Sequence, residues 1–85
     1  MEYFEALKSI AKDRGVKVTD IGPKAGRSRT YVSECVTNAR MPSLSVGNEL
    51  AAPLGYRLAL IPTDTPADAL DAIGAIPLDA APREQ

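Results

Sequence analysis

Apolar and polar residues at the start of the chain repeat with the period of an α-helix. The apolar positions between residues 2 and 14 fall on one helical face, and they are Phe4, Leu7, Ile10 and Ala11. Charged residues occupy the opposite face, which is typical of a helix with one buried side. Gly15 follows, and glycine favours the left-handed turn that ends many helices. The pattern predicts an amphipathic helix over residues 2–14.

A second, shorter helix is predicted before Gly26. Thr19 or Asp20 can accept an amide hydrogen bond at its start. Its inward-facing residues are expected to be Val18, Ile21 and Ala25. Pro23 lacks a backbone donor, and its ring clashes with the carbonyl four residues earlier in a regular helix. We therefore expect this helix to be shortened, kinked or restarted near Pro23.

The residues after Gly26 predict a third helix with one apolar and one polar face. Ser28 is a favourable N-cap, so the helix is expected over residues 29–37. Its inward-facing residues are Val32, Cys35 and Val36. Its outward-facing residues are Arg29, Thr30, Ser33 and Glu34. Asn38, which tolerates a positive φ, is expected to turn the chain after this helix.

A fourth helix and a strand are predicted next. Ser43 or Ser45 can cap a helix that runs to about Ala52. Its apolar anchors are expected to be Leu44, Val46 and Leu50. Residues 56–61 are rich in β-compatible side chains and lie between Gly55 and Pro62, which predicts a strand.

A single strand leaves its backbone groups unpaired, and this chain offers no second strand. The same segment of a second copy is the expected partner, giving a two-stranded sheet across a two-fold axis. The side chains expected to form this dimer contact are Tyr56, Leu58, Leu60 and Ile61.

A short last helix is predicted after the strand. Pro66 follows an N-cap, Thr65, and precedes an acid, which predicts a helix over residues 66–73 ended by Gly74. Residues 77–85 carry too little apolar content to fold and are expected to form a mobile tail.

The length and the charge of the chain limit the classes of function that it can have. A chain of 85 residues forms one small domain, which makes a large enzyme cleft improbable. The net charge of −1 conceals an asymmetry: residues 1–57 carry nine Lys/Arg and six Asp/Glu, hence +3, whereas residues 58–85 carry one and five, hence −4. A basic body suits phosphate, and an acidic end suits a different partner.

Residue types for catalysis are scarce. The chain has no histidine, no glycine-rich phosphate loop and no repeated metal-ligand spacing, so we expect no enzyme activity, no cofactor and no metal. Its one cysteine, Cys35, has the helical phase of Val32 and is expected in the core. The longest apolar run, residues 58–61, is too short to span a bilayer. With no leader-like start and no possible internal disulfide, a cytoplasmic location is expected.

Several positions together resemble a known family. They are Gly15, Ile21 with Gly22, Ala25 with Gly26, Ser28, Val32, Cys35, and Pro42 with Ser43. Over about residues 4–55 the chain resembles the lambda-repressor-like, or Xre-type, helix-turn-helix family. The resemblance implies a mainly α fold, a helix-turn-helix bundle of four to five short helices, with the C-terminal strand seen in some members. Gly22 and Pro23 stand where this family usually has a helical Ala-Glu pair.

The resemblance also implies a DNA-binding surface. The residues expected to read base edges in the major groove are Arg29, Thr30, Ser33 and Glu34. The residues expected to contact phosphates are Arg27, Ser28, Tyr31, Asn38, Arg40 and Ser43. The structural alternatives are a solvated surface arginine at position 29 and a tyrosine at position 31 that only packs across the turn.

Two functions follow as hypotheses. The first is a homodimeric repressor of phage-regulator or antitoxin type that binds a near-palindromic operator in double-stranded DNA. Residues 1–55 then bind DNA, residues 56–76 dimerise and residues 77–85 form the tail. The second is a protein-interaction module, or an antitoxin, whose acidic segment after Pro62 binds a partner protein such as a basic toxin.

Overall fold

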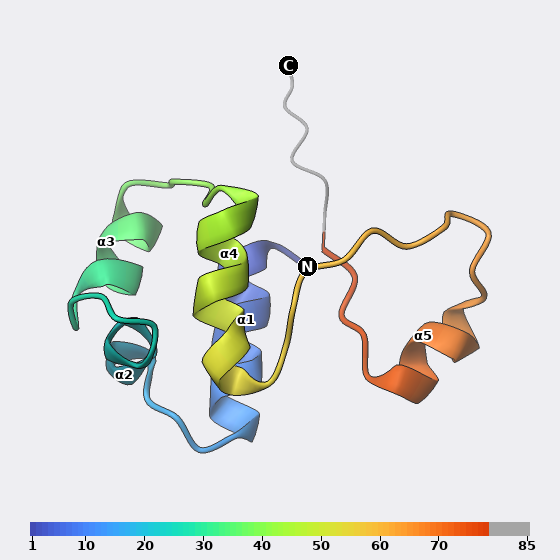
Figure 1. Cartoon of the computed structure of the whole chain (residues 1–85), viewed down its shortest axis with the longest axis horizontal. Helices are drawn as coiled ribbons and strands as arrows, with labels where there is room; N and C mark the ends of the chain where they lie inside the picture. The colour runs from blue at the N-terminus through green and yellow to red at the C-terminus, as the bar shows by residue number, and fades with distance from the viewer. Residues whose placement is uncertain (79–85) are drawn as a thin grey trace.

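The computed structural model describes residues 1–78, which form five α-helices and one short 3-10 helix (Figure 1). Their bounds are α1 (Tyr3–Asp13), α2 (Val18–Lys24), α3 (Tyr31–Thr37), α4 (Leu44–Ala51), η1 (Ala52–Leu54) and α5 (Ala67–Ile73). The described residues are thus mainly helical, as predicted, and they contain no strand. No helix within residues 1–78 combines the length and the apolar content that crossing a membrane requires.

The core lies between the first four helices. The largest fully buried side chains come one from each of α1, α2, α3 and α4, and they are Leu7, Ile21, Val32 and Leu50. The four apolar residues predicted to form the inner face of α1 are all buried, which confirms that helix and its orientation. Burial of a Leu or Ile side chain contributes about 1.5–3 kcal/mol, so these contacts are a main source of stability in a small domain.

A buried hydrogen bond joins α1 to α4. The Tyr3 hydroxyl donates to the Gly47 backbone oxygen at 2.6 Å. Burial raises the pKa of Tyr3 to about 12, because the charged phenolate is poorly solvated there. The phenol therefore stays protonated at neutral pH and remains available as a donor.

Two helices begin at residues other than those predicted. Helix α2 starts at Val18 after Lys17, so neither Thr19 nor Asp20 caps it. It is short, as predicted, and ends one residue after Pro23, so the proline interrupts only its last turn. Helix α3 starts at Tyr31, two residues later than predicted, and Ser28 does not cap it.

Two apolar residues predicted to face inward are exposed. Val36 of α3 is 40% exposed and Leu44 of α4 is 81% exposed. Helix α3 contacts the core through Val32 and Cys35, which leaves Val36 at the edge of the buried face. Leu44 is the first residue of α4 and lies beyond the part of that helix that meets the core.

The strand predicted over residues 56–61 is absent from the single chain. A strand needs a neighbour to pair with, and residues 1–78 supply none. Tyr56 and Leu58 instead pack against the core, and the Leu58 N–H donates to the Asn48 side-chain oxygen at 3.0 Å. We call residues 56–78 the C-terminal arm.

Helix α5 lies within the C-terminal arm and begins one residue later than predicted, with Pro66 rather than Thr65 at its N-cap, and Gly74 ends it with φ of +74°. Figure 1 shows α5 standing away from the other helices, and none of its residues is buried. The predicted mobile tail begins at residue 77, and most of it, residues 79–85, lies outside the described residues.

The end of α3 places an alanine in a conformation that favours glycine. Asn38 tolerates a positive φ and was expected to turn the chain, but its φ is −88°, and Ala39 has the positive φ, +51°. The Arg40 N–H donates to the Cys35 oxygen at 2.9 Å, which closes the helix around this left-handed residue. A Cβ atom in this region costs about 1–2 kcal/mol.

We therefore expect Ala39→Gly to raise the free energy of unfolding by about 0.5–1 kcal/mol, since the relieved strain exceeds the added entropy of the unfolded chain. The measurement is the urea midpoint at constant m. Asn38→Gly is the matched control and should give no gain, because residue 38 already has a negative φ. Equal shifts for the two variants would contradict this account.

Candidate nucleic-acid interface

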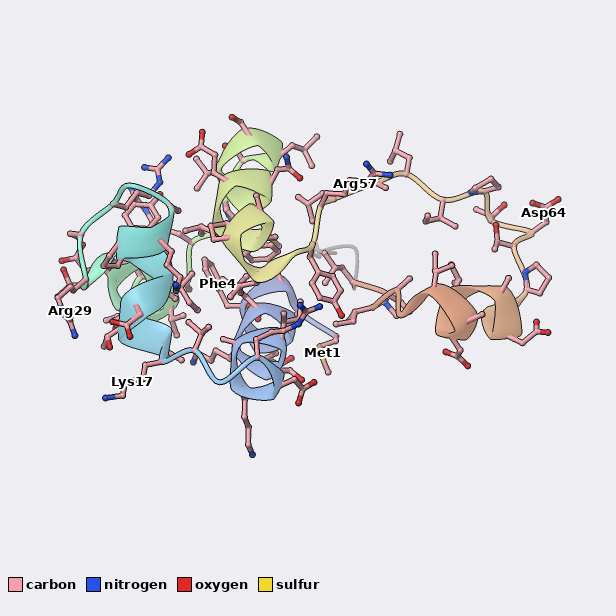
Figure 2. All side chains as sticks on the ribbon, turned by 60° about the horizontal axis from the view of Figure 1, so that its bottom comes forward. Met1, Phe4, Lys17, Arg29, Arg57 and Asp64 are labelled. Atoms are coloured by element: carbon pink, nitrogen blue, oxygen red, sulfur yellow. The ribbon has the colours of Figure 1, made fainter. Side chains whose placement is uncertain are left out.

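The polar side of α3 and of the turn before it is open to solvent. Exposed residues on this side are Ser28, Arg29, Thr30, Ser33 and Glu34. The opposite side of α3 is held in the core by Val32 and Cys35. Figure 2 shows Arg29 at the outer edge of the molecule, pointing away from the bundle. The residues predicted to read bases are therefore brought together on one accessible surface.

A close backbone contact fixes α2 against the turn that precedes α3. A Cβ atom placed on Gly22 would lie only 2.1 Å from the Ser28 backbone oxygen. The turn itself closes α2, since the Arg27 N–H donates to the Gly22 oxygen at 2.8 Å and Gly26 takes φ of +79°. Position 22 therefore accepts no side chain, which gives a structural reason for glycine there.

Arg29 lies in the turn rather than in the helix. Its Nη1 is 3.5 Å from Asp20 Oδ1 on α2, and its side chain is 69% exposed. The guanidinium is thus held loosely at one end and is otherwise in water. An exposed pair of this kind contributes little to stability, typically about 0–1 kcal/mol.

Thr30 and Glu34, both predicted to read bases, are joined to each other. The Thr30 hydroxyl donates to Glu34 Oε2 at 3.1 Å, one helical turn away. The Ser28 hydroxyl lies 3.5 Å from that of Thr30. These three polar groups form a continuous row ahead of and along the first turn of α3.

Arg27 faces the body of the protein rather than open solvent. Its Nη2 lies 2.6 Å from Glu49 Oε1 on α4, and its guanidinium stacks 4.7 Å from the centroid of the Tyr31 ring. The hydrogen bond that Arg27 donates to the Glu49 carboxylate raises the pKa of Arg27, because it stabilises the charged guanidinium. Tyr31 is half-buried, so the contacts within the chain favour packing across the turn over a free phosphate clamp for both side chains.

The remaining predicted phosphate contacts are exposed. Asn38, Arg40 and Ser43 all lie on the surface between α3 and α4. The Ser43 hydroxyl accepts the Val46 N–H at 3.2 Å, which confirms Ser43 as the cap of α4. Its remaining lone pair and its hydroxyl hydrogen stay available for a ligand.

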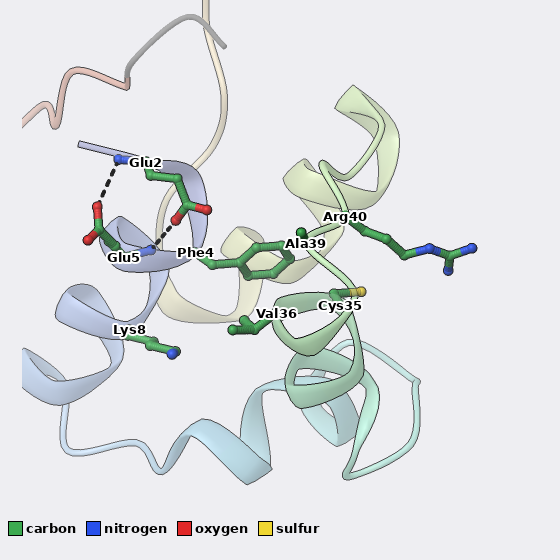
Figure 3. Close-up of a pocket in the computed structure, with 8 residues that line it drawn as sticks. All are labelled: Glu2, Phe4, Glu5, Lys8, Cys35, Val36, Ala39 and Arg40. Atoms are coloured by element: carbon green, nitrogen blue, oxygen red, sulfur yellow. Dashed lines mark hydrogen bonds between the residues drawn. The ribbon is translucent and has the colours of Figure 1, made fainter. Parts of the chain in front are cut away.

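Arg40 also borders a cavity of about 370 Å³ between the start of α1 and the end of α3 (Figure 3). Its other lining residues are Glu2, Phe4, Glu5, Lys8, Cys35, Val36 and Ala39. The carboxylates of Glu2 and Glu5 each accept the other's backbone N–H, at 2.9 and 3.3 Å, and so cap α1. No group of three or more potential metal-ligating side chains occurs within residues 1–78.

Acidic side chains accompany the cations of this surface. Residues 17–49 carry five Lys/Arg and three Asp/Glu, hence +2. Each of the three acids contacts a residue predicted to touch DNA: Asp20 with Arg29, Glu34 with Thr30 and Glu49 with Arg27. Sequence reasoning missed Asp20 and Glu49 as members of this surface. Nothing in local periodicity links an acid to an arginine 22 residues away.

The four side chains predicted to dimerise are divided between two environments. Tyr56 and Leu58 are half-buried against the core, and Arg14 lies 5.6 Å from the centroid of the Tyr56 ring. Leu60 is fully exposed, and Ile61 is partly exposed. The structure therefore leaves only the second pair free for contact with another molecule.

No family model, curated protein or solved structure matches the chain.

The Gly22 contact generates a stability prediction. Gly22→Ala should lower the free energy of unfolding by about 1–3 kcal/mol, because the new methyl group overlaps the Ser28 carbonyl and α2 must move from the turn. Chemical denaturation followed by circular dichroism measures the change. Gly47→Ala is the control: its Cβ would meet side-chain atoms rather than backbone, the end of Leu58 at 3.0 Å and the Tyr3 ring at 3.5 Å, and the gain in helix propensity offsets the closer contact. Similar losses for both variants would contradict the proposed clash.

Proposed function

We propose that the chain is a sequence-specific DNA-binding transcriptional regulator, a homodimeric repressor of phage-regulator or antitoxin type. One observation carries the proposal: the polar side of α3 and its preceding turn is exposed, while Val32 and Cys35 fix the other side of the same helix in the core. A helix presented in this way fits the major groove of B-DNA, which admits one α-helix.

Arg29 and Thr30 are the main base-reading residues of this surface, because they immediately precede the first turn of α3. Arg29 donates two hydrogen bonds to guanine O6 and N7, a contact that discriminates bases by about 1–3 kcal/mol. Thr30 contacts a thymine methyl group or a base acceptor. Ser33 and Glu34 lie farther along the helix, where Glu34 accepts from the cytosine amino group.

Phosphate contacts flank the reading residues. Ser28 lies before α3, and Asn38, Arg40 and Ser43 lie after it, so a backbone that follows the groove meets both groups. Arg27 lies behind this surface, where it contacts both the Tyr31 ring and Glu49. Arg27 reaches a phosphate only after its ion pair with Glu49 breaks.

The dimer is formed by the exposed part of the C-terminal arm. Leu60 and Ile61 present apolar side chains to solvent, and they also line an apolar groove of about 440 Å³ between α1 and the arm. A β-compatible segment with unpaired backbone N–H and C=O groups is a template for pairing with a second chain. Antiparallel pairing of two such segments across a two-fold axis presents two α3 helices to half-sites about 34 Å apart.

The base-reading role predicts a difference between two arginines. Arg29→Ala should weaken binding to the operator by at least about tenfold while changing binding to random DNA little, because a lost bidentate base contact is specific. Arg40→Ala should weaken binding to both DNAs alike and reduce the slope of log K against log salt by about one. Fluorescence anisotropy at two salt concentrations, with an operator selected from a random library, measures both effects.

Equal losses for Arg29→Ala on the two DNAs would contradict base reading. Absence of a steep salt dependence for the native chain would contradict DNA binding altogether and favour the second candidate function described below.

Dimerisation through residues 56–61 predicts that a charge in this segment lowers the mass of the particle in solution. Leu60→Glu should shift the chain from dimer to monomer in analytical ultracentrifugation, because it places a charge at a paired apolar position. Ile73→Glu is the matched control: Ile73 is also exposed but lies on α5, so the dimer should persist. A monomeric native chain, or dissociation by both variants, would contradict dimerisation through residues 56–61.

A second candidate function is supported by α5. This seven-residue helix buries none of its residues, and helices of that length are marginal in water without packing. The described part of the arm after Arg57 contains three acids, Asp64, Asp68 and Asp71, and no Lys or Arg. A partner with a basic surface and an apolar pocket for Ile73 suits this helix, as expected of an antitoxin that covers a toxin.

A further inference from the structure

We propose that Asp20 is a positioning residue for Arg29 and thereby sets the sequence selectivity of the DNA-binding surface without touching a base. The proposal depends on the proposed function, since it assigns a role to a residue behind the expected base reader. It rests on the contact between Asp20 Oδ1 and Arg29 Nη1 at 3.5 Å.

Asp20 is the one charged partner that residues 1–78 supply to Arg29. Arginine carries five N–H donors in a planar fork, so a carboxylate at one nitrogen leaves an edge with two donors for a guanine. A guanidinium that is 69% exposed would otherwise sample many directions. The carboxylate restricts these directions before DNA binds and lowers the entropy lost on binding.

The fold keeps the carboxylate in place relative to the turn. Ile21, next to Asp20, is only 1% exposed and anchors α2 in the core. Gly22 brings the backbone of α2 against the carbonyl of Ser28, immediately before Arg29. Asp20 and Arg29 therefore sit on two segments that cannot slide past each other.

The negative charge of Asp20 also repels DNA phosphates. This repulsion weakens binding to random DNA and to the operator alike, so it leaves their ratio unchanged. The orientation of Arg29 favours only the complex in which Arg29 meets a guanine, and it alone raises the ratio of operator affinity to random-DNA affinity.

The other two acids of the surface do not have this arrangement. Glu49 holds Arg27 in its stack on Tyr31, facing α4 rather than a duplex. Glu34 accepts a hydrogen bond from Thr30, and both of these residues are themselves proposed to face the major groove of DNA. Asp20 alone among these acids supports an exposed arginine from a separate helix.

The test is a double-mutant cycle of Asp20→Asn and Arg29→Ala, with affinities for the selected operator and for a random duplex measured by fluorescence anisotropy. Asp20→Asn should tighten binding to random DNA and lower the operator-to-random ratio by about 2- to 5-fold. In the Arg29→Ala background the same substitution should leave the ratio unchanged. Asp20→Glu should restore part of the ratio, since it keeps the charge.

Asp13→Asn is the matched control, since it removes one exposed acid at the end of α1 and should not alter the ratio. Thermal unfolding of each variant verifies that it is folded. An unchanged ratio for Asp20→Asn, or an equal fall in both backgrounds, would overturn the positioning role while leaving base reading by Arg29 intact. If Arg29→Ala itself leaves the ratio unchanged, base reading fails and the positioning role fails with it.

Discussion

The arrangement of the first four helices depends on one apolar contact, the meeting of Leu7, Ile21, Val32 and Leu50 in the core. Helices α2 and α3 have seven residues each, too few to be stable in isolation. Their apolar residues supply the stabilisation that their own hydrogen bonds lack. Because each short helix is held by one face, its other face is left for solvent or a ligand, and this is the origin of the exposed polar side of α3.

A second constraint converts this packing into a defined surface. The absence of a side chain at Gly22 lets α2 approach the Ser28 carbonyl, and this approach sets where the turn leaves α2 and where α3 begins. The residues proposed to read bases thus lie at a fixed distance from α2. The surface also differs from a plain basic patch, since acids contact three of its polar or cationic residues. Such a surface suits recognition that depends on geometry more than on attraction to phosphate alone.

Most of the C-terminal arm is not packed against the core. Tyr56 and Leu58 continue the core, but beyond them Leu60, Ile61 and Ile73 expose apolar side chains. Single exposed apolar side chains are common, whereas contiguous ones often mark interaction sites, and Leu60 and Ile61 are adjacent in the chain and line the apolar groove beside α1. The arm therefore contains both the segment that we propose to pair with a second copy and the acidic helix that we propose to bind a basic partner. Both uses are compatible, because they involve different residues of the arm.

The sequence by itself determined the features that depend on neighbouring residues: the buried face of α1, the short α2 around Pro23, the cap at Ser43 and the glycine turn after α5. Only the tertiary structure decided the start of α3 at Tyr31, the left-handed conformation of Ala39, the exposure of Leu44 and the partners of Arg27 and Arg29. Helical periodicity and capping act over three or four residues, so they can be recognised along the chain. Which end of a helix meets the core, and which acid meets which arginine, depends on how distant segments pack, and a one-dimensional pattern does not contain that distance.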